Sequence, residues 1–226
     1  MKLTSEQEQI LNGLLLGDGC LFLGKSNINP LLTVARAEKD LEYLKFQANI
    51  FNNLCSGEGI IKSNKHDKKS NKIYIGYKFR TRALKILKPY YKLWYPNSKK
   101  IVPFNLKITP LTMAHWFCDD GCISLKKDRN GHKSKAMILK LSTNSFTKEE
   151  VEFLHHLLSN RYGNLFTICK DSLDWYKKKN PYYKDGNKNY YIRTYTEGAT
   201  NIFEDIKGVF PKGMTRKYNI FNGAKP

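Results

Sequence analysis

The sequence has few cysteines and no apolar run long enough to cross a membrane. Its five cysteines are an odd number, and their spacing lacks the Cys and His pairs that bind zinc. We therefore expect free thiols in a reducing compartment. The apolar stretch near Leu11–Leu23 is interrupted by Asp18, and it is shorter than the about 20 residues that span a bilayer. We predict no membrane segment.

The N-terminus lacks the features of a targeting peptide. No apolar region follows its positively charged start, and it is acidic where a transit peptide is rich in Arg. We expect a protein that is not secreted and that works where it is made. Its richness in Asn, Lys, Ile and Tyr points to an AT-rich genome, which favours an organelle (mitochondrion or chloroplast) or a bacterial cytoplasm.

Acidic residues are scarce. The chain has 39 Lys and Arg against 20 Asp and Glu, for a formal net charge of +19 at pH 7. The excess is spread evenly, with 18 basic and 8 acidic residues in 1–105, and 21 and 12 in 106–226. A globular chain that is basic throughout favours a nucleic acid partner. A sugar hydrolase with paired carboxylates would not explain this charge.

Two stretches of the sequence resemble each other. Residues 11–20 read LNGLLLGDGC and residues 113–122 read MAHWFCDDGC, so each is an apolar run that ends in Asp-Gly-Cys. A single run of this kind is typical of a buried helix whose terminal Asp meets solvent. The repetition argues against that interpretation and indicates a duplicated unit.

Both runs carry the signals of helices. Thr4 and Gln7 have the spacing of a capping box, and Thr109 with Pro110 is typical of a helix start. We expect the glycines that follow Asp18 and Asp120 to end the helices.

Asp18 and Asp120 are thus predicted in the last turn of each helix. A carboxylate there faces the negative end of the helix dipole, which is unfavourable unless a cation neutralises it. Two such helix ends brought together predict a site for a divalent metal with oxygen ligands.

The pattern of apolar residues predicts an α+β protein with two halves, residues 1–105 and 106–226. Each half has the order helix, two strands, helix, two strands, helix (αββαββα). The ranges expected in the first half are helix 4–18, strands within 20–36, helix 38–54, strands 59–63 and 72–80, and helix 82–94. Those in the second are strands 122–126 and 136–143, a helix from Thr147, strands 165–170 and 189–195, and helix 197–209.

The two runs resemble the LAGLIDADG motif of homing endonucleases, in the form that carries two motifs on one chain. The eighth motif position, the catalytic acid of the family, is Asp18 and Asp120, and the ninth is Gly19 and Gly121. Departures are Asn12 at the second position, Leu16 and Cys118 at the sixth, and His115 at the third. His115 replaces a Gly and bears on how closely the two motif helices pack.

The resemblance implies a monomer whose motif helices lie side by side at a pseudo-twofold axis. Each half then presents a curved four-stranded antiparallel sheet, and the two sheets form a saddle over double-stranded DNA. It also implies that Asp18 and Asp120 are catalytic and bind Mg²⁺, with Mn²⁺ able to substitute. The backbone carbonyls of Gly17 and Asp119 are further ligands by resemblance, and Lys100 and Lys217 are catalytic lysines.

Basic and aromatic residues of the predicted strands and loops are the candidates for DNA contact. The alternative for each residue is that it lies on a solvated face of a strand and does not contact DNA. The candidates are Arg36, Lys62, Lys68, Lys69, Tyr77, Lys78, Arg80 and Arg82 in the first half, and Lys126, Arg129, Lys135, Lys140, Lys170 and Arg193 in the second.

The resemblance therefore predicts a site-specific homing endonuclease encoded by a mobile intron. It would hydrolyse one phosphodiester in each strand of a long asymmetric site. The main alternative is a maturase on the same fold that binds its own intron RNA. A DNA-binding regulator without catalysis is a third hypothesis.

Overall fold

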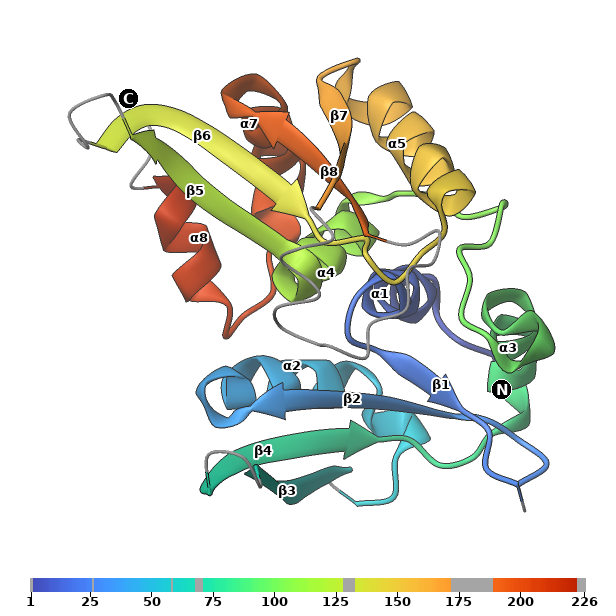
Figure 1. Ribbon diagram of the computed structural model, residues 1–226. Coiled ribbons are helices and arrows are strands. Elements are labelled where there is room, and N and C mark those ends of the chain that lie inside the picture. The colour runs from blue at the N-terminus through green and yellow to red at the C-terminus, as the bar shows by residue number, and fades with distance from the viewer. Residues whose placement is uncertain are drawn as a thin grey trace.

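The computed structural model describes residues 2–25, 27–57, 59–67, 71–127, 133–171 and 189–222. It contains two four-stranded antiparallel sheets, with helices between and beside them (Figure 1). The predicted α+β class and the repeated order of elements are confirmed. The candidates Lys68, Lys69 and Arg129 lie outside the described residues.

The N-terminal sheet has the strand order β1-β2-β4-β3. Its strands pair in continuous antiparallel register, with Cys20 opposite Thr33 and Thr33 opposite Arg80. The elements of this half are α1 (Ser5–Leu16), β1 (Cys20–Phe22), β2 (Leu31–Ala37), α2 (Leu41–Ile50), β3 (Ile60–Asp67), β4 (Lys72–Arg80) and α3 (Lys88–Trp94).

The C-terminal sheet repeats this topology with the order β5-β6-β8-β7. Cys122 pairs with Lys140 and Lys140 with Arg193, which corresponds to the row of Cys20, Thr33 and Arg80. The elements are α4 (Pro110–Asp120), β5 (Gly121–Lys127), β6 (Lys133–Leu141), α5 (Lys148–Tyr162), β7 (Phe166–Lys170), β8 (Tyr190–Tyr195), α7 (Thr196–Ile206) and α8 (Thr215–Asn222). Helix α8 was not predicted.

The starts of both motif helices follow the predicted capping chemistry. The hydroxyl oxygen of Thr4 accepts a hydrogen bond from the backbone N–H of Gln7. Oε1 of Gln7 accepts one from the backbone N–H of Thr4, so the capping box is complete. Helix α1 nevertheless ends at Leu16, because the backbone of Gly17 leaves the helical conformation (φ −104°, ψ −132°). Asp18 therefore follows the helix instead of lying in its last turn, whereas Asp120 is the last residue of α4.

The hairpin formed by β3 and β4, whose strands are rich in polar residues, is longer than predicted. Strand β3 continues to Asp67, which pairs with Lys72, so most of the predicted loop 63–72 is strand. The sequence signal failed here because a strand ladder is held by backbone hydrogen bonds, and its polar side chains can remain solvated.

The motif helices α1 and α4 lie side by side at the centre of the molecule, between the two sheets (Figure 1). Their backbones approach closely at Gly13, where an added Cβ would lie 2.5 Å from the carbonyl oxygen of Thr112. It would also lie 2.8 Å from the Cβ of His115. The side chain of His115 is therefore accommodated because the facing residue is glycine.

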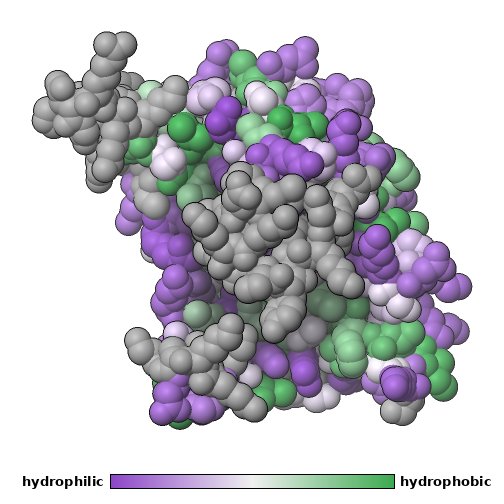
Figure 2. Space-filling model, viewed as in Figure 1, coloured by the Kyte–Doolittle hydropathy of each residue, from purple (hydrophilic) through white to green (hydrophobic). Residues whose placement is uncertain are grey.

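One apolar core extends through both halves. Leu14 and Leu15 of α1 and Met113 and Trp116 of α4 are completely buried in it. The halves thus share their interior and hold the two motif helices in a fixed relation. Figure 2 shows hydrophilic residues over much of the surface in view, with hydrophobic residues in smaller groups. Within the described residues, none of the helices has the length and apolar character needed to cross a membrane.

Candidate functional site

Three carboxylates gather where the motif helices end. Asp18 follows α1, and Asp119 and Asp120 close α4. The backbone N–H of Asp18 donates to Oδ2 of Asp119 over 3.1 Å, which joins helix ends about a hundred residues apart in the sequence. The position before Asp18 must be glycine, because a Cβ at Gly17 would lie 2.4 Å from the Cβ of Asp119.

Arg36 bridges two of these carboxylates. Its Nη1 lies 2.5 Å from Oδ2 of Asp18, and its Nη2 lies 2.5 Å from Oδ1 of Asp119. The side chains of Arg36 and Asp119 are buried, whereas that of Asp18 is 51% exposed. The expectation that Arg36 lies on a DNA-facing surface is therefore corrected. The alternation of β2 places it with the buried Leu32 and Val34, on the side of the sheet that faces the helices.

Two further side chains complete this buried network. The hydroxyl of Tyr43, from α2, donates to Asp119 over 3.3 Å and lies 3.0 Å from Nδ1 of His115. The guanidinium of Arg36 lies 5.0 Å from the centre of the Tyr43 ring. Burial, together with the charge of Arg36, lowers the pKa of His115 to about 3, so the imidazole is neutral near pH 7. The contacts of Tyr43 and His115 with this cluster were not predicted from the sequence.

Two lysines bind the carbonyl groups at the ends of the motif helices. Nζ of Lys100 donates to the carbonyls of Gly17 and Gly19, each over 3.0 Å. Nζ of Lys217 does the same in the other half, at 2.6 Å from the carbonyls of Cys118 and Gly121. The cations stabilise the negative helix ends and place positive charge beside the carboxylates.

The two backbone carbonyls predicted as metal ligands accept hydrogen bonds from these lysines. That of Gly17 accepts from Lys100, and that of Asp119 accepts from Lys217 over 3.4 Å. In the structure, these oxygens therefore face ammonium groups.

Burial and mutual repulsion perturb the acids of the cluster. Burial raises the pKa of Asp120 to about 7, and the charges of Asp18 and Asp119 contribute to the rise. Burial likewise raises the pKa of Asp119 to about 6, although Arg36 opposes the shift. A carboxyl with a raised pKa is stabilised in its charged form when a cation binds beside it.

The chemistry of the donors fits a divalent cation. Carboxylate oxygens are the ligands that Mg²⁺ prefers, and Mg²⁺ usually keeps several waters or phosphate oxygens as well. Among the described residues, no three or more acidic, His or Cys side chains form a complete metal-binding group. A cation held by Asp18 and Asp120 would therefore need water or phosphate oxygens as further ligands.

The open face of the C-terminal sheet carries two of the predicted DNA-contact residues. Lys140 and Arg193 pair across β6 and β8 on the face opposite the buried Leu139 and Ile192. Each cation lies over a tyrosine ring: Nζ of Lys140 is 3.7 Å from the centre of the Tyr191 ring, and Cζ of Arg193 is 5.1 Å from that of Tyr195. Lys140 also forms an ion pair with Asp171 over 3.3 Å.

The open face of the N-terminal sheet carries Lys78 and Arg80. They lie on β4 in the phase opposite to the buried Phe79, and Arg80 pairs with Thr33. Cys20, Thr33 and Arg80 are paired across β1, β2 and β4. Because Cys20 is two residues after Asp18, this row of residues starts next to the carboxylate cluster. Arg80 is the counterpart of Arg193.

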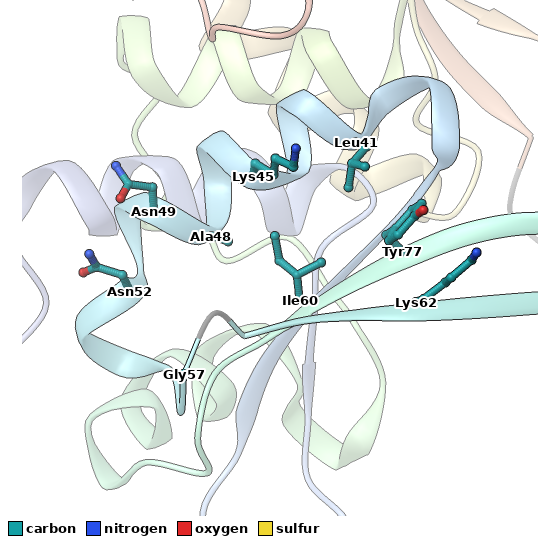
Figure 3. Close-up of a pocket in the computed structure, with 9 residues that line it drawn as sticks. All are labelled: Leu41, Lys45, Ala48, Asn49, Asn52, Gly57, Ile60, Lys62 and Tyr77. Carbon is teal, nitrogen blue, oxygen red and sulfur yellow. The ribbon is translucent and has the colours of Figure 1, made fainter.

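Two other candidates of this half lie on the opposite side of the sheet. Lys62 and Tyr77 share the face of Ile60 and line a hollow of about 590 Å³ beneath α2, as Figure 3 shows. Their expected place on an open DNA-facing surface is corrected. The physical reason is the period of two along each strand, which puts alternate side chains toward α2.

The remaining candidates lie at or beyond the ends of strands, or have side chains outside the described part of the structure. Lys170 is exposed but shares the helix side of its sheet, since it pairs with Tyr190 next to the buried Ile192. Arg82 donates to the carbonyls of Asn53 and Leu54 and supports the chain after α2. Lys126 and Lys135 belong to β5 and β6, but their side chains lie outside the described residues.

The two repeated halves meet through α1 and α4, which pack closely at a glycine. A carboxylate lies at or just after the end of each of these helices. This arrangement defines the homing endonuclease class of fold. The chain belongs to the LAGLIDADG DNA endonuclease family, whose profile matches residues 8–197.

Two relatives with different names are similar to this chain in sequence. The uncharacterized protein MJ1098 of Methanocaldococcus jannaschii is 30% identical over 174 residues, which are 74% of this chain and 61% of that protein. The cytochrome b mRNA maturase bI2 of Debaryomyces hansenii is 30% identical over 74% of this chain and 61% of its own length. The chain thus spans about three fifths of these two relatives.

A full-length relative and solved structures also match. The DNA endonuclease I-ChuI of Chlamydomonas applanata is 25% identical over 100% of this chain and 99% of its own length. The structure of the homing endonuclease I-WcaI bound to its DNA recognition sequence is 25% identical, with a TM-score of 0.73 over 96% of this chain and 87% of that one. I-GzeII in complex with its DNA target, at 13% identity and a TM-score of 0.54, shares the fold.

Proposed function

We propose that this protein is a site-specific DNA endonuclease that hydrolyses one phosphodiester in each strand of its target. The observation that carries the proposal is that Asp18 is joined to the end of α4, where its N–H bonds to Asp119 next to Asp120, with a basic open sheet face on either side. Family membership and the endonuclease relatives support it. We further propose that the protein acts as a monomer, since one chain supplies both carboxylates.

The chemistry follows from the charges of the cluster. Asp18 and Asp120 would hold Mg²⁺, or Mn²⁺ in its place, through their carboxylate oxygens. When bound there, the cation would lower the pKa of an attacking water and polarise the phosphoryl oxygen. Lys100 and Lys217 fix the ends of the motif helices through their carbonyls, and their charge favours the anionic phosphate in the transition state.

Recognition of DNA falls to the open sheet faces. Arg and Lys side chains that project from a sheet can reach base edges in the major groove or the phosphates beside it. Lys78 and Arg80 would serve one half of the site, and Lys140 and Arg193 the other. Because Thr33 and Lys140 occupy equivalent positions in the two sheets, the halves differ in chemistry, and we propose a long asymmetric target.

Cleavage of a randomised target library in the presence of Mg²⁺ tests the proposal. Sequencing the cut ends should give one long asymmetric site, and a plasmid that carries it should become linear. Asp18→Asn and Asp120→Asn should each abolish linearisation and leave binding intact. Asp205→Asn is the matched control, because Asp205 pairs with Arg161 away from the cluster. Linearisation at the normal rate by both cluster variants would refute the assignment.

A maturase is the second candidate, because two relatives carry the name cytochrome b mRNA maturase bI2. A maturase would bind its own intron RNA in preference to unrelated RNA of equal length, and it would restore splicing in vitro. We propose that the gene lies in a mobile intron of an organelle or of a bacterium. Relatives named as intron-encoded endonucleases support the intron origin.

A further inference from the structure

Among the residues that the structure describes, the network around Asp18 has no equivalent around Asp120. The registers of the sheets make Thr33 the counterpart of Lys140, so Thr143 occupies the place of Arg36 in the second half. Thr143 carries no charge and donates to the carbonyl of Tyr190 over 2.8 Å. The two pseudo-symmetric halves therefore differ at this position, which is the charged Arg36 in the first half and the uncharged Thr143 in the second.

The asymmetry extends to the acid that Arg36 binds. Asp119 has Gly17 as its counterpart in the first motif, one residue before the carboxylate of the motif. A side chain at Gly17 would collide with Asp119, since its Cβ would lie 2.4 Å from the Cβ and 2.7 Å from Oδ2 of that residue. Only one half can carry a side chain at this position, and here it is the second.

The two candidate metal ligands thus differ in their surroundings. Oδ2 of Asp18 is held by the buried guanidinium of Arg36, and Asp119 fixes both that guanidinium and the backbone N–H of Asp18. In the part of the chain that the structure describes, the carboxylate of Asp120 forms no ion pair. A cation that binds Asp18 must share its oxygen with the guanidinium of Arg36. The charges of Lys100 and Lys217 act on Asp120, but within the described residues neither forms an ion pair with its carboxylate.

We infer that Arg36 and Asp119 are positioning residues that give Asp18 a built-in counter-ion and make the two carboxylate sites unequal in metal affinity. The site beside Asp120 binds the metal more tightly, and the site beside Asp18 binds it more weakly. The inference rests on the proposed function, because it takes Asp18 and Asp120 as the metal ligands.

Titration of the free protein with Mn²⁺ at about pH 8, followed by the electron paramagnetic resonance signal of the unbound ion, tests the inference without DNA. The wild type should show a tighter and a weaker site that differ about tenfold in affinity, the change that about 1.4 kcal/mol produces. Asp120→Asn should remove the tighter site, and Asp18→Asn should remove the weaker one.

The decisive variant is the double change Arg36→Met with Asp119→Asn. Removing both members of a buried pair avoids leaving one unpaired charge in the interior, which would be strongly destabilising. The double variant retains Asp18, Asp120 and both lysines, so its two affinities should become equal to within about threefold (about 0.7 kcal/mol). Arg36→Lys, which keeps the charge, should retain the inequality. Arg161→Met, which breaks an exposed Arg–Asp pair elsewhere, should leave the isotherm unchanged.

Three results would overturn the inference: equal affinities in the wild type, an unchanged isotherm in the double variant, or no binding of Mn²⁺ by the free protein. Circular dichroism of each variant shows whether it is folded. If the double variant does not fold, Asp119→Asn alone should narrow the difference between the sites, and an unchanged difference overturns the inference. Cleavage of DNA by the wild type would support the proposed function in each of these cases, so the two failures are distinguishable.

Discussion

Replacing Gly13 by alanine should separate the two motif helices. The new Cβ would lie 2.5 Å from the carbonyl oxygen of Thr112 and 2.8 Å from the Cβ of His115. The first of these atoms belongs to the backbone of α4 and cannot rotate away, so we expect the upper end of the about 1–3 kcal/mol that overpacking costs. Alanine is the better helix former by about 1 kcal/mol, which offsets part of this cost.

The net loss of unfolding free energy should be about 2 kcal/mol, which lowers the Tm of a chain of this length by about 4–8 °C. Thermal unfolding of the free protein, monitored by circular dichroism, measures the loss. Gly208→Ala is the matched control, because nothing lies within 4 Å of the position of its Cβ. The control should leave the Tm unchanged or raise it slightly.

The same substitution should also reduce cleavage, because the helices carry the two carboxylates. Gly13→Ala should slow linearisation of a target plasmid more than it weakens DNA binding, which depends on the sheet faces. A Gly13→Ala variant with an unchanged Tm and normal cleavage would refute the close packing of α1 and α4 on which the site depends.

Three other perturbations follow from the site and the fold. Burial holds the pKa of Asp120 near 7 in the free protein, so cleavage at limiting Mg²⁺ should fall about tenfold per pH unit below 7, and saturating Mg²⁺ should move this fall to lower pH. Arg80→Ala and Arg193→Ala should each weaken DNA binding by about 1–3 kcal/mol if the arginine contacts guanine. If it contacts phosphate, the slope of log affinity against log salt should fall by about one. If neither variant changed binding, the open sheet faces would not form the DNA interface. Thr4→Ala should lower the unfolding free energy by about 1 kcal/mol through loss of the capping box, as measured by urea unfolding.

The fold could be predicted because its signals are local and occur twice. Caps at Thr4 and Thr109 and the repeated Asp-Gly-Cys triplets locate the motif helices. Polar strands gave the weaker signal, and the extent of β3 was missed for that reason. The end of α1 was missed because Gly17 and Gly19 are both plausible stops, and the backbone leaves the helical conformation at the first of them.

The cluster itself was only partly predictable. Acidic positions follow from the motif, whereas the ion pairs of Arg36 depend on which face of β2 packs against the helices. A signal existed, because Leu32, Val34 and Arg36 alternate in one phase and so predict that Arg36 shares the buried face. The same argument applies to Tyr77 beside Phe79. The contact of Tyr43 with Asp119 has no such signal, since it joins residues 76 positions apart.

The pairing of Asp18 with Asp120 around bound metal is tested most directly by crystals of the protein with its target DNA and Mn²⁺. Anomalous diffraction locates the manganese ions without reference to any assumed role of a residue. The account predicts peaks within about 2.5 Å of carboxylate oxygens of both Asp18 and Asp120, beside the two scissile phosphates. Manganese at the scissile phosphates without either carboxylate as a ligand would contradict it.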